Sequence, residues 1–202
     1  MLSKYSERID MNTDKEVLME ESGLVEKIKN NERTAFKTFY EIYKDMIYSV
    51  CYRILNNKQD ADDATQDVFV KAIRSIQKFR GDAKLSTWLY QIAVNTSLNY
   101  ARRKKLVMWL SLDFLMGKEE YHLDNSKARP DLEMEKNESE ALVQHAIHSL
   151  PARQRTAVIL QKYQGLSYKE IADVMETSLS AVESLLHHAK ENIVDKLLQL
   201  IK

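Results

Sequence analysis

The sequence predicts an all-α protein made of two small helical domains joined by a linker. Only 4 Gly and 2 Pro occur among 202 residues, which leaves few turns for a β fold. Apolar residues recur at spacings of three and four through most of the chain after residue 22, as amphipathic helices require. The chain length suits one or two domains, each large enough to bury a small core.

The overall composition excludes several classes of protein. Formal net charge is zero, from 30 basic and 30 acidic residues, so bulk charge does not indicate a nucleic-acid partner. Cys51 is the single cysteine and lies among apolar residues, which excludes a disulfide framework within the chain. No apolar run is long enough to span a bilayer, and there is no signal peptide. We therefore expect a protein of the reducing cytoplasm.

The first domain is predicted over 23–105, after a mobile N-terminal extension over 1–22 that lacks an apolar period. Its periodicity predicts helices over about 24–30, 32–44 and 45–55, the last two nearly continuous. The dipeptides Asn30-Asn31 and Asn56-Asn57 are break signals. An aromatic stripe at helical spacing indicates core packing and consists of Phe36, Phe39, Tyr40 and Tyr43.

The next helix, predicted over 60–79 with Asp60 as its N-cap, is amphipathic and begins with an acidic face. Its apolar face consists of Ala61, Ala64, Val68, Phe69, Ala72, Ile73 and Ile76. The segment 71–105 then carries nine Lys or Arg against one acid, together with four aromatic residues. An acidic helix face followed by a basic, aromatic-bearing segment predicts two partners, a basic protein surface and a polyanion.

Gly81 is predicted to end this helix. The following helix is expected to begin near Ser86 or Thr87, either of which is a suitable N-cap, and to run to Lys105. We expect Trp88 to lie in the core. The basic and amide side chains of this region are then the better candidates for contact with a nucleic acid.

These stretches resemble the promoter-melting domain of bacterial sigma factors of the extracytoplasmic-function type. The matching residues are Asp60-Ala-Asp-Asp-Ala-Thr-Gln-Asp-Val-Phe-Val-Lys-Ala72, Phe79-Arg-Gly, and Ser86-Thr-Trp-Leu-Tyr-Gln-Ile-Ala-Val-Asn95. Two later stretches resemble the second domain of that family: Leu150-Pro-Ala-Arg-Gln-Arg155 and Leu166-Ser-Tyr-Lys-Glu-Ile-Ala172. The two blocks occur in the family's order and cover most of residues 24–200.

The resemblance implies that the acidic helix docks on the clamp helices of the largest subunit of core RNA polymerase. The docking candidates are Asp60, Asp63, Gln66 and Asp67. Carboxylates facing a basic coiled coil would steer the encounter and fix the register more than they would add affinity. Spaced carboxylates also suggest a metal, but no His or Cys is near enough in the sequence to complete a site, so we expect no metal and no cofactor.

The resemblance also implies that the loop over 80–84 captures a flipped base of the minus-ten promoter box. The helix after the loop would hold the melted strand, since unpaired bases are held by pockets, aromatic faces and a basic groove. The candidates for these contacts are Arg80, Lys84, Asn95, Asn99, Arg102 and Arg103.

A linker is predicted over 106–135, where seven acids stand against three bases. Its first part, over 106–116, is unusually apolar and either packs the two domains together or covers the surface of an inhibitor. By resemblance the linker would thread the product channel of the polymerase, with Asp113, Glu119 and Glu120 in the place of nucleic acid.

The second domain is predicted over 136–202 and contains a helix-turn-helix. One helix ends before Pro151, and the next runs over 152–163 and stops at Gly165. Ser167 and Glu170 form a capping box for the first helix of the motif, over 167–175. A turn over 176–178 leads to a recognition helix over 180–197. The expected buried contacts are Ile171, Ala172, Val174, Leu179, Val182 and Leu186.

The N-terminal residues of such a helix read the major groove, here at the minus-thirty-five box. The base-reading candidates are Ser180, Ala181, Glu183, Ser184 and His187, and the phosphate candidates are Lys169, His188 and Lys190. Two features depart from the family. Glu176 occupies a turn position usually held by Gly, and the region 150–202 carries seven bases against six acids, so we expect this domain alone to bind DNA weakly.

The sequence therefore predicts a promoter-specificity factor that binds core polymerase and promoter DNA. The resemblance implies an anti-sigma factor as a further partner. The sequence shows no nucleophile–base pair and no phosphate loop, so we expect no catalysis. Two alternatives stay open at this point. One is an autonomous helix-turn-helix regulator, and the other is a polymerase-binding regulator that does not touch DNA.

Overall fold

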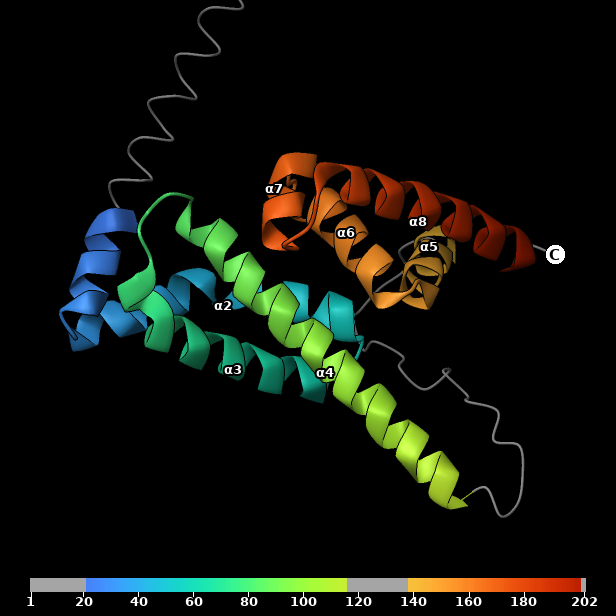
Figure 1. Ribbon diagram of the computed structural model, residues 1–202, viewed down its shortest axis with the longest axis horizontal. Helices are drawn as coiled ribbons and strands as arrows, with labels where there is room; N and C mark the ends of the chain where they lie inside the picture. Colours follow the sequence, from blue (N-terminus) through green and yellow to red (C-terminus); the bar gives the residue numbers. More distant parts are fainter. Residues whose placement is uncertain (1–20, 116–137, 201–202) are drawn as a thin grey trace, which may run out of the picture.

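The structure is a computed structural model that describes residues 21–115 and 138–200 (Figure 1). Most of these residues are helical, and no strand occurs among them, which confirms the all-α prediction. A helix over 21–29 is followed by α2 (Arg33–Leu55), α3 (Lys58–Ser75), the 3-10 turn η1 (Ile76–Lys78) and α4 (Leu85–Leu115). After the undescribed segment come α5 (Glu138–Ser149), α6 (Ala152–Lys162), α7 (Tyr168–Val174) and α8 (Leu179–Leu200).

Helices α2, α3 and α4 pack against one another and enclose the core of the first domain (Figure 1). The segments predicted as helices over 32–44 and 45–55 form one continuous helix, α2. Its buried side chains include Phe39, Ile47 and Cys51, so the cysteine is a core residue as predicted. Helix α2 ends at Asn56, which adopts the left-handed conformation with φ of 51°.

Two predicted caps are wrong. Asp60 is not the N-cap of α3, because the left-handed Asn56 lets the helix begin at Lys58 and the side chain of Asn57 accepts the Asp60 N–H. Neither Ser86 nor Thr87 caps α4, which begins at Leu85. The Leu85 N–H instead donates to Glu21 Oε2 at 2.9 Å. Glu21 is already helical, so the helix starts inside the segment predicted as an extension.

The helix after Gly81 is predicted to end at Lys105, and this is also wrong, because α4 continues to Leu115. No Gly or Pro interrupts the chain between Leu85 and Leu115, and the next Gly is Gly117. The first part of the predicted linker therefore extends the helix. Figure 1 shows this C-terminal part of α4 projecting beyond α2 and α3.

In the second domain α5, α6 and α7 pack around α8. The predicted capping box is present: Ser167 Oγ accepts from the Glu170 N–H, and Glu170 Oε2 accepts from the Ser167 N–H. Gly165 adopts a φ of 68° between α6 and α7, as its role of stop signal requires. Leu179, however, is 49% exposed and not a buried contact, because it is the first residue of α8 and lies on the exposed side of a first turn whose buried residue is Val182.

The two domains contact each other along α2 and α4 on one side and α6 and α7 on the other. One cluster of buried residues runs across both domains, from Leu89 in α4 to Leu160 in α6 and Ile171 in α7. The Arg53 guanidinium at the end of α2 also lies 3.7 Å from the centre of the Tyr163 ring. The described parts of the two domains thus share a core.

Candidate functional site

Helix α3 presents the four docking candidates in two different settings. Asp63 and Gln66 are exposed. Asp60 pairs with Lys104 of α4, and Asp67 Oδ2 accepts a hydrogen bond from the Tyr100 hydroxyl at 3.0 Å. Two of the four docking candidates are therefore free to meet another protein, and the other two are engaged with α4.

Exposed apolar side chains adjoin this acidic face. Val70 is 45% and Ile73 38% exposed, and the spacing of residues 63, 66, 70 and 73 places all four on one side of α3. Tyr40 of α2 is 47% exposed and its ring lies 4.8 Å from that of Phe69. Tyr40 and Ile73 were predicted as core residues. The helical spacing from Asp63 to Ile73 was a signal that could have placed Ile73 on the same side of α3 as the docking candidates, whereas no spacing within α3 could have found Tyr40 of α2.

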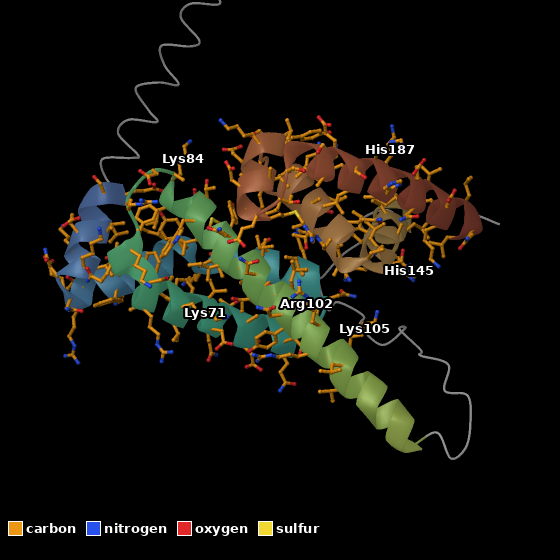
Figure 2. The ribbon with its side chains drawn as sticks, in the orientation of Figure 1. Lys71, Lys84, Arg102, Lys105, His145 and His187 are labelled. Atoms are coloured by element: carbon orange, nitrogen blue, oxygen red, sulfur yellow. The ribbon has the colours of Figure 1, made fainter. Side chains whose placement is uncertain are left out.

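The loop before α4 and α4 itself carry the candidates for the melted strand. Arg80, Lys84, Asn95, Asn99, Arg102 and Arg103 are all exposed. Arg80 forms an ion pair with Asp82 at 3.2 Å. Figure 2 shows Lys84 at the start of α4 and Arg102 and Lys105 well along it, so these cations are spread along the helix.

A small pocket of about 230 Å³ lies beside this loop. Its lining includes Arg80 and Asp82 of the loop and Trp88 of α4. Trp88 is half-buried with its ring centre 5.1 Å from that of Phe79, so the expectation that it packs in the core holds in part. An aromatic wall beside a basic loop is a surface on which an unpaired base can stack.

The recognition helix candidates lie at the N-terminal half of α8. Ser178 Oγ accepts the Ala181 N–H at 3.2 Å and so caps the helix. Figure 2 shows His187 on the side of α8 that faces away from α4. Ala181 is half-buried, and the other candidates of α8 are exposed: Ser180, Glu183, Ser184, His187, His188 and Lys190. The remaining candidate, Lys169, is exposed on α7.

Ser180 Oγ lies 3.0 Å from Ser178 Oγ, and the two histidines among these candidates have an acidic partner. His187 and His188 both lie within 4 Å of Glu191, at 3.5 and 3.1 Å. Glu176, in the turn before α8, adopts the positive φ of 49° that the family's usual Gly would take without strain.

Metal and membrane sites do not appear in the part of the chain that the structure describes. No group of three or more His, Cys, Asp or Glu among these residues is arranged to hold a metal ion. None of the described helices is both long and apolar enough to cross a membrane.

Comparisons with known proteins match both domains. The family model for sigma-70 region 2 matches residues 39–107, and that for sigma-70 region 4 matches residues 140–193. The RNA polymerase sigma-H factor of Pseudomonas aeruginosa is 35% identical over 89% of this chain and 94% of its own. The ECF RNA polymerase sigma factor SigW of Bacillus subtilis is 30% identical over 87% of this chain and 96% of its own.

A solved structure shares the fold. The sigma factor RpoE of Bartonella quintana, solved in complex with the anti-sigma factor NepR, aligns with a TM-score of 0.59. The alignment covers 83% of this chain and 98% of that one at 19% identity. Two domain models in the family's order, and relatives that match along nearly the whole chain, show that this protein belongs to the extracytoplasmic-function group of the sigma-70 family.

Proposed function

We propose that the chain performs its sigma-factor role through three separate surfaces, one for core RNA polymerase and one for each promoter box. The observation that carries this proposal is the exposed face of α3, where Asp63 and Gln66 adjoin Val70 and Ile73. Exposed apolar groups beside carboxylates suit a protein partner, because the apolar area supplies affinity and the charges supply register. Asp60 and Asp67 support the same surface by tying α3 to α4.

The docking surface is tested by charge reversal. The double variant Asp63→Lys, Gln66→Lys removes one negative and adds two positive charges on exposed positions, so the fold should remain intact. We expect loss of co-purification with core polymerase. Asp45→Lys, at an exposed position of α2, is the control and should bind as the native chain does. Unchanged binding of the double variant would mean that α3 is not the dock.

The proposed roles of the two domains follow from their exposed groups. Domain 23–105 would hold the flipped base and melted strand of the minus-ten box through Arg80, Lys84, Asn95, Asn99, Arg102 and Arg103. Domain 136–202 would read the minus-thirty-five box through the N-terminal half of α8. The segment 106–135 would connect them, although its first ten residues belong to α4 and its remainder lies outside the described residues.

Further partners and the location of the protein follow from the family. The Bartonella quintana sigma factor was solved with an anti-sigma factor, which supports an inhibitor of this kind for the present chain. We expect a cytoplasmic protein with no catalytic activity of its own. The two alternatives, an autonomous regulator and a polymerase-binding protein that ignores DNA, are disfavoured because the chain's relatives are sigma factors along nearly its whole length.

A further inference from the structure

The loop over 80–84, to which we assign the flipped base, is exposed at each of its positions. Its ion pair between Arg80 and Asp82 is also exposed, and such pairs contribute little to holding a chain in one conformation. Gly81 has no Cβ and a φ of 80°, so the loop has many conformations to lose when it becomes ordered. A loop of this kind depends on contacts from elsewhere in the protein to keep one shape.

The helix over 21–29 lies beside this loop (Figure 1) and contacts the chain where the loop begins. Lys29 Nζ donates to the Phe79 carbonyl at 3.1 Å, in the peptide bond that joins Phe79 to Arg80. A second hydrogen bond runs the other way, because Gln77 Nε2 donates to the Lys29 carbonyl at 3.0 Å. Lys29 therefore holds the start of the loop through both its side chain and its backbone.

The first described residue of the same helix contacts the chain where the loop ends. Glu21 Oε2 accepts the Leu85 N–H at 2.9 Å, in the peptide bond that joins Lys84 to Leu85. Glu21 Oε1 accepts from the Tyr43 hydroxyl at 3.0 Å, which ties the carboxylate to α2. A negative charge at the start of α4 is also favourable, because the first N–H groups of a helix have no partner within it. Glu21 therefore fixes the end of the loop.

The helix over 21–29 is suited to be a rigid spacer between these two contacts. Its side chains Val25 and Ile28 are only 3% and 1% exposed and pack in the core of the first domain. Glu21 and Lys29 are separated by about 12 Å of helix, at a rise of 1.5 Å per residue. The anchored helix therefore sets how far apart the two ends of the loop lie.

We propose that Glu21 and Lys29 are positioning residues for promoter opening, which hold the two ends of the loop over 80–84 in the shape that captures the flipped base. This inference rests on the role of the loop proposed above. Neither residue would touch DNA, and both would act by ordering the loop before the base binds, which removes an entropic cost from binding. Their loss should weaken recognition of one base and leave the phosphate contacts of Arg102 and Arg103 unchanged.

The first test measures base preference. Core polymerase carrying each variant selects from a fully randomised single-stranded oligonucleotide library, and the bound molecules are sequenced. At the position that the loop reads, the native chain should prefer one base by on the order of tenfold. In Glu21→Ala and in Lys29→Met this preference should fall to about twofold, while preferences at other positions and the total amount bound stay as in the native chain. Glu21→Gln keeps an oxygen that accepts the Leu85 N–H and should restore the preference.

The matched control is Asn57→Ala, which also removes a side-chain acceptor from a backbone N–H at the start of a helix in the first domain. The Asn57 side chain accepts the Asp60 N–H at 2.9 Å, at the end of α3 that is about 25 Å from the loop. Asn57→Ala should lower the urea midpoint about as much as Glu21→Ala and leave the base preference native. Equal loss of preference in these two variants would show that reduced stability is the cause and would overturn the inference.

The second test observes the loop itself. Ala83→Cys is labelled with a nitroxide before assembly with core polymerase, and the native Cys51 is fully buried and does not react. Adding Glu21→Ala or Lys29→Met should narrow the electron paramagnetic resonance lines, because the label then moves faster on the nanosecond timescale. Adding Glu21→Gln or Asn57→Ala should leave the spectrum unchanged. Lys29→Met keeps most of the apolar part of its side chain and decides the test if Glu21→Ala does not fold.

The two tests together separate this inference from the assignment of the loop to the minus-ten box. If the native chain on core polymerase prefers no base, that assignment is wrong, and the mobility of the label alone decides whether Glu21 and Lys29 order the loop. If the native chain shows a preference that neither variant changes, and the spectra are also unchanged, the loop keeps its role and the positioning inference is wrong.

Discussion

The Tyr100 hydroxyl of α4 donates a hydrogen bond to Asp67 Oδ2 of α3 at 3.0 Å. This contact distinguishes two aspartates of α3 that the sequence alone does not distinguish. Asp67 is half-buried and hydrogen-bonded within its own domain, whereas Asp63 is exposed. The hydrogen bond and the charge of Asp67 also raise the pKa of Tyr100, after the larger effect of burial.

We therefore predict different outcomes for Asp67→Ala and Asp63→Ala. Asp67→Ala leaves the Tyr100 hydroxyl without its partner and should lower the free energy of unfolding by about 1 kcal/mol. Asp63→Ala should leave that free energy within about 0.5 kcal/mol of native, as surface substitutions usually do, and weaken core polymerase binding instead. Urea titrations of both variants give the stabilities. Equal destabilisation by the two would mean that the Tyr100 contact contributes nothing.

Glu176 provides a test of backbone strain. It holds a φ of 49°, which costs a residue with a Cβ about 1 kcal/mol relative to Gly. Glu176→Gly should relieve the strain but also lose the hydrogen bond to Gln91. We therefore predict that Glu176→Gly raises the free energy of unfolding only in a chain that already carries Gln91→Ala, where this hydrogen bond is absent. There the midpoint of thermal unfolding should rise by a few degrees, roughly as 1 kcal/mol implies for a small domain. A fall in the midpoint would show that this turn is unstrained.

The order and type of the helices followed from the sequence because they depend on local signals. The Ser167–Glu170 capping box, the Gly165 stop and the left-handed Asn56 all act within a few residues and lie where their patterns predict. Local signals could not predict that Glu21 accepts a hydrogen bond from the Leu85 N–H at the start of α4, since the two residues are 64 positions apart in the sequence. The contact of α7 with α4 is of the same long-range kind.

Exposure on the helix faces was only partly predictable. Ile73 lies on the apolar side of α3 but is 38% exposed, because that side is wider than the strip which α2 and α4 cover. The periodicity of apolar residues predicts which side of a helix a residue lies on, but it does not predict how much of that side a neighbouring helix covers. The same limit explains why Tyr40 was predicted in the core and found half-exposed. The assigned roles in polymerase and promoter binding stay predictions.

Arg102 and Arg103 should act after polymerase docking. Both are exposed on α4 beyond the Tyr100 contact, and their charges suit a phosphate backbone. We predict that Arg102→Glu, Arg103→Glu abolishes promoter opening in run-off transcription with core polymerase while co-purification with the enzyme persists. Arg33→Glu, Lys37→Glu makes the same charge change at exposed positions of α2 and serves as the control. Normal transcription by the first variant would remove these arginines from the strand surface.

His148 should make the stability of the chain depend on pH. Burial, followed by the positive charges of Arg155, Arg53 and His145, lowers the pKa of His148 from 6.5 to about 4. Its Nδ1 and the Arg155 Nε are buried without a hydrogen-bond partner among the described residues. The unfolded chain takes up a proton near pH 6.5 and the folded chain does not until about pH 4, so stability is full above 6.5 and declines as pH falls between these values.

The size of this effect is limited by the partial exposure of the ring. We predict that the free energy of unfolding falls by about 1–2 kcal/mol between pH 7 and pH 5, after allowance for solvent screening. His148→Gln should remove most of this decline, because glutamine does not titrate, whereas His145→Gln at an exposed position should retain it. Urea midpoints at the two pH values measure the difference. If the two variants lose stability equally on acidification, His148 is not the group that titrates, and the decline belongs to carboxylates elsewhere in the chain.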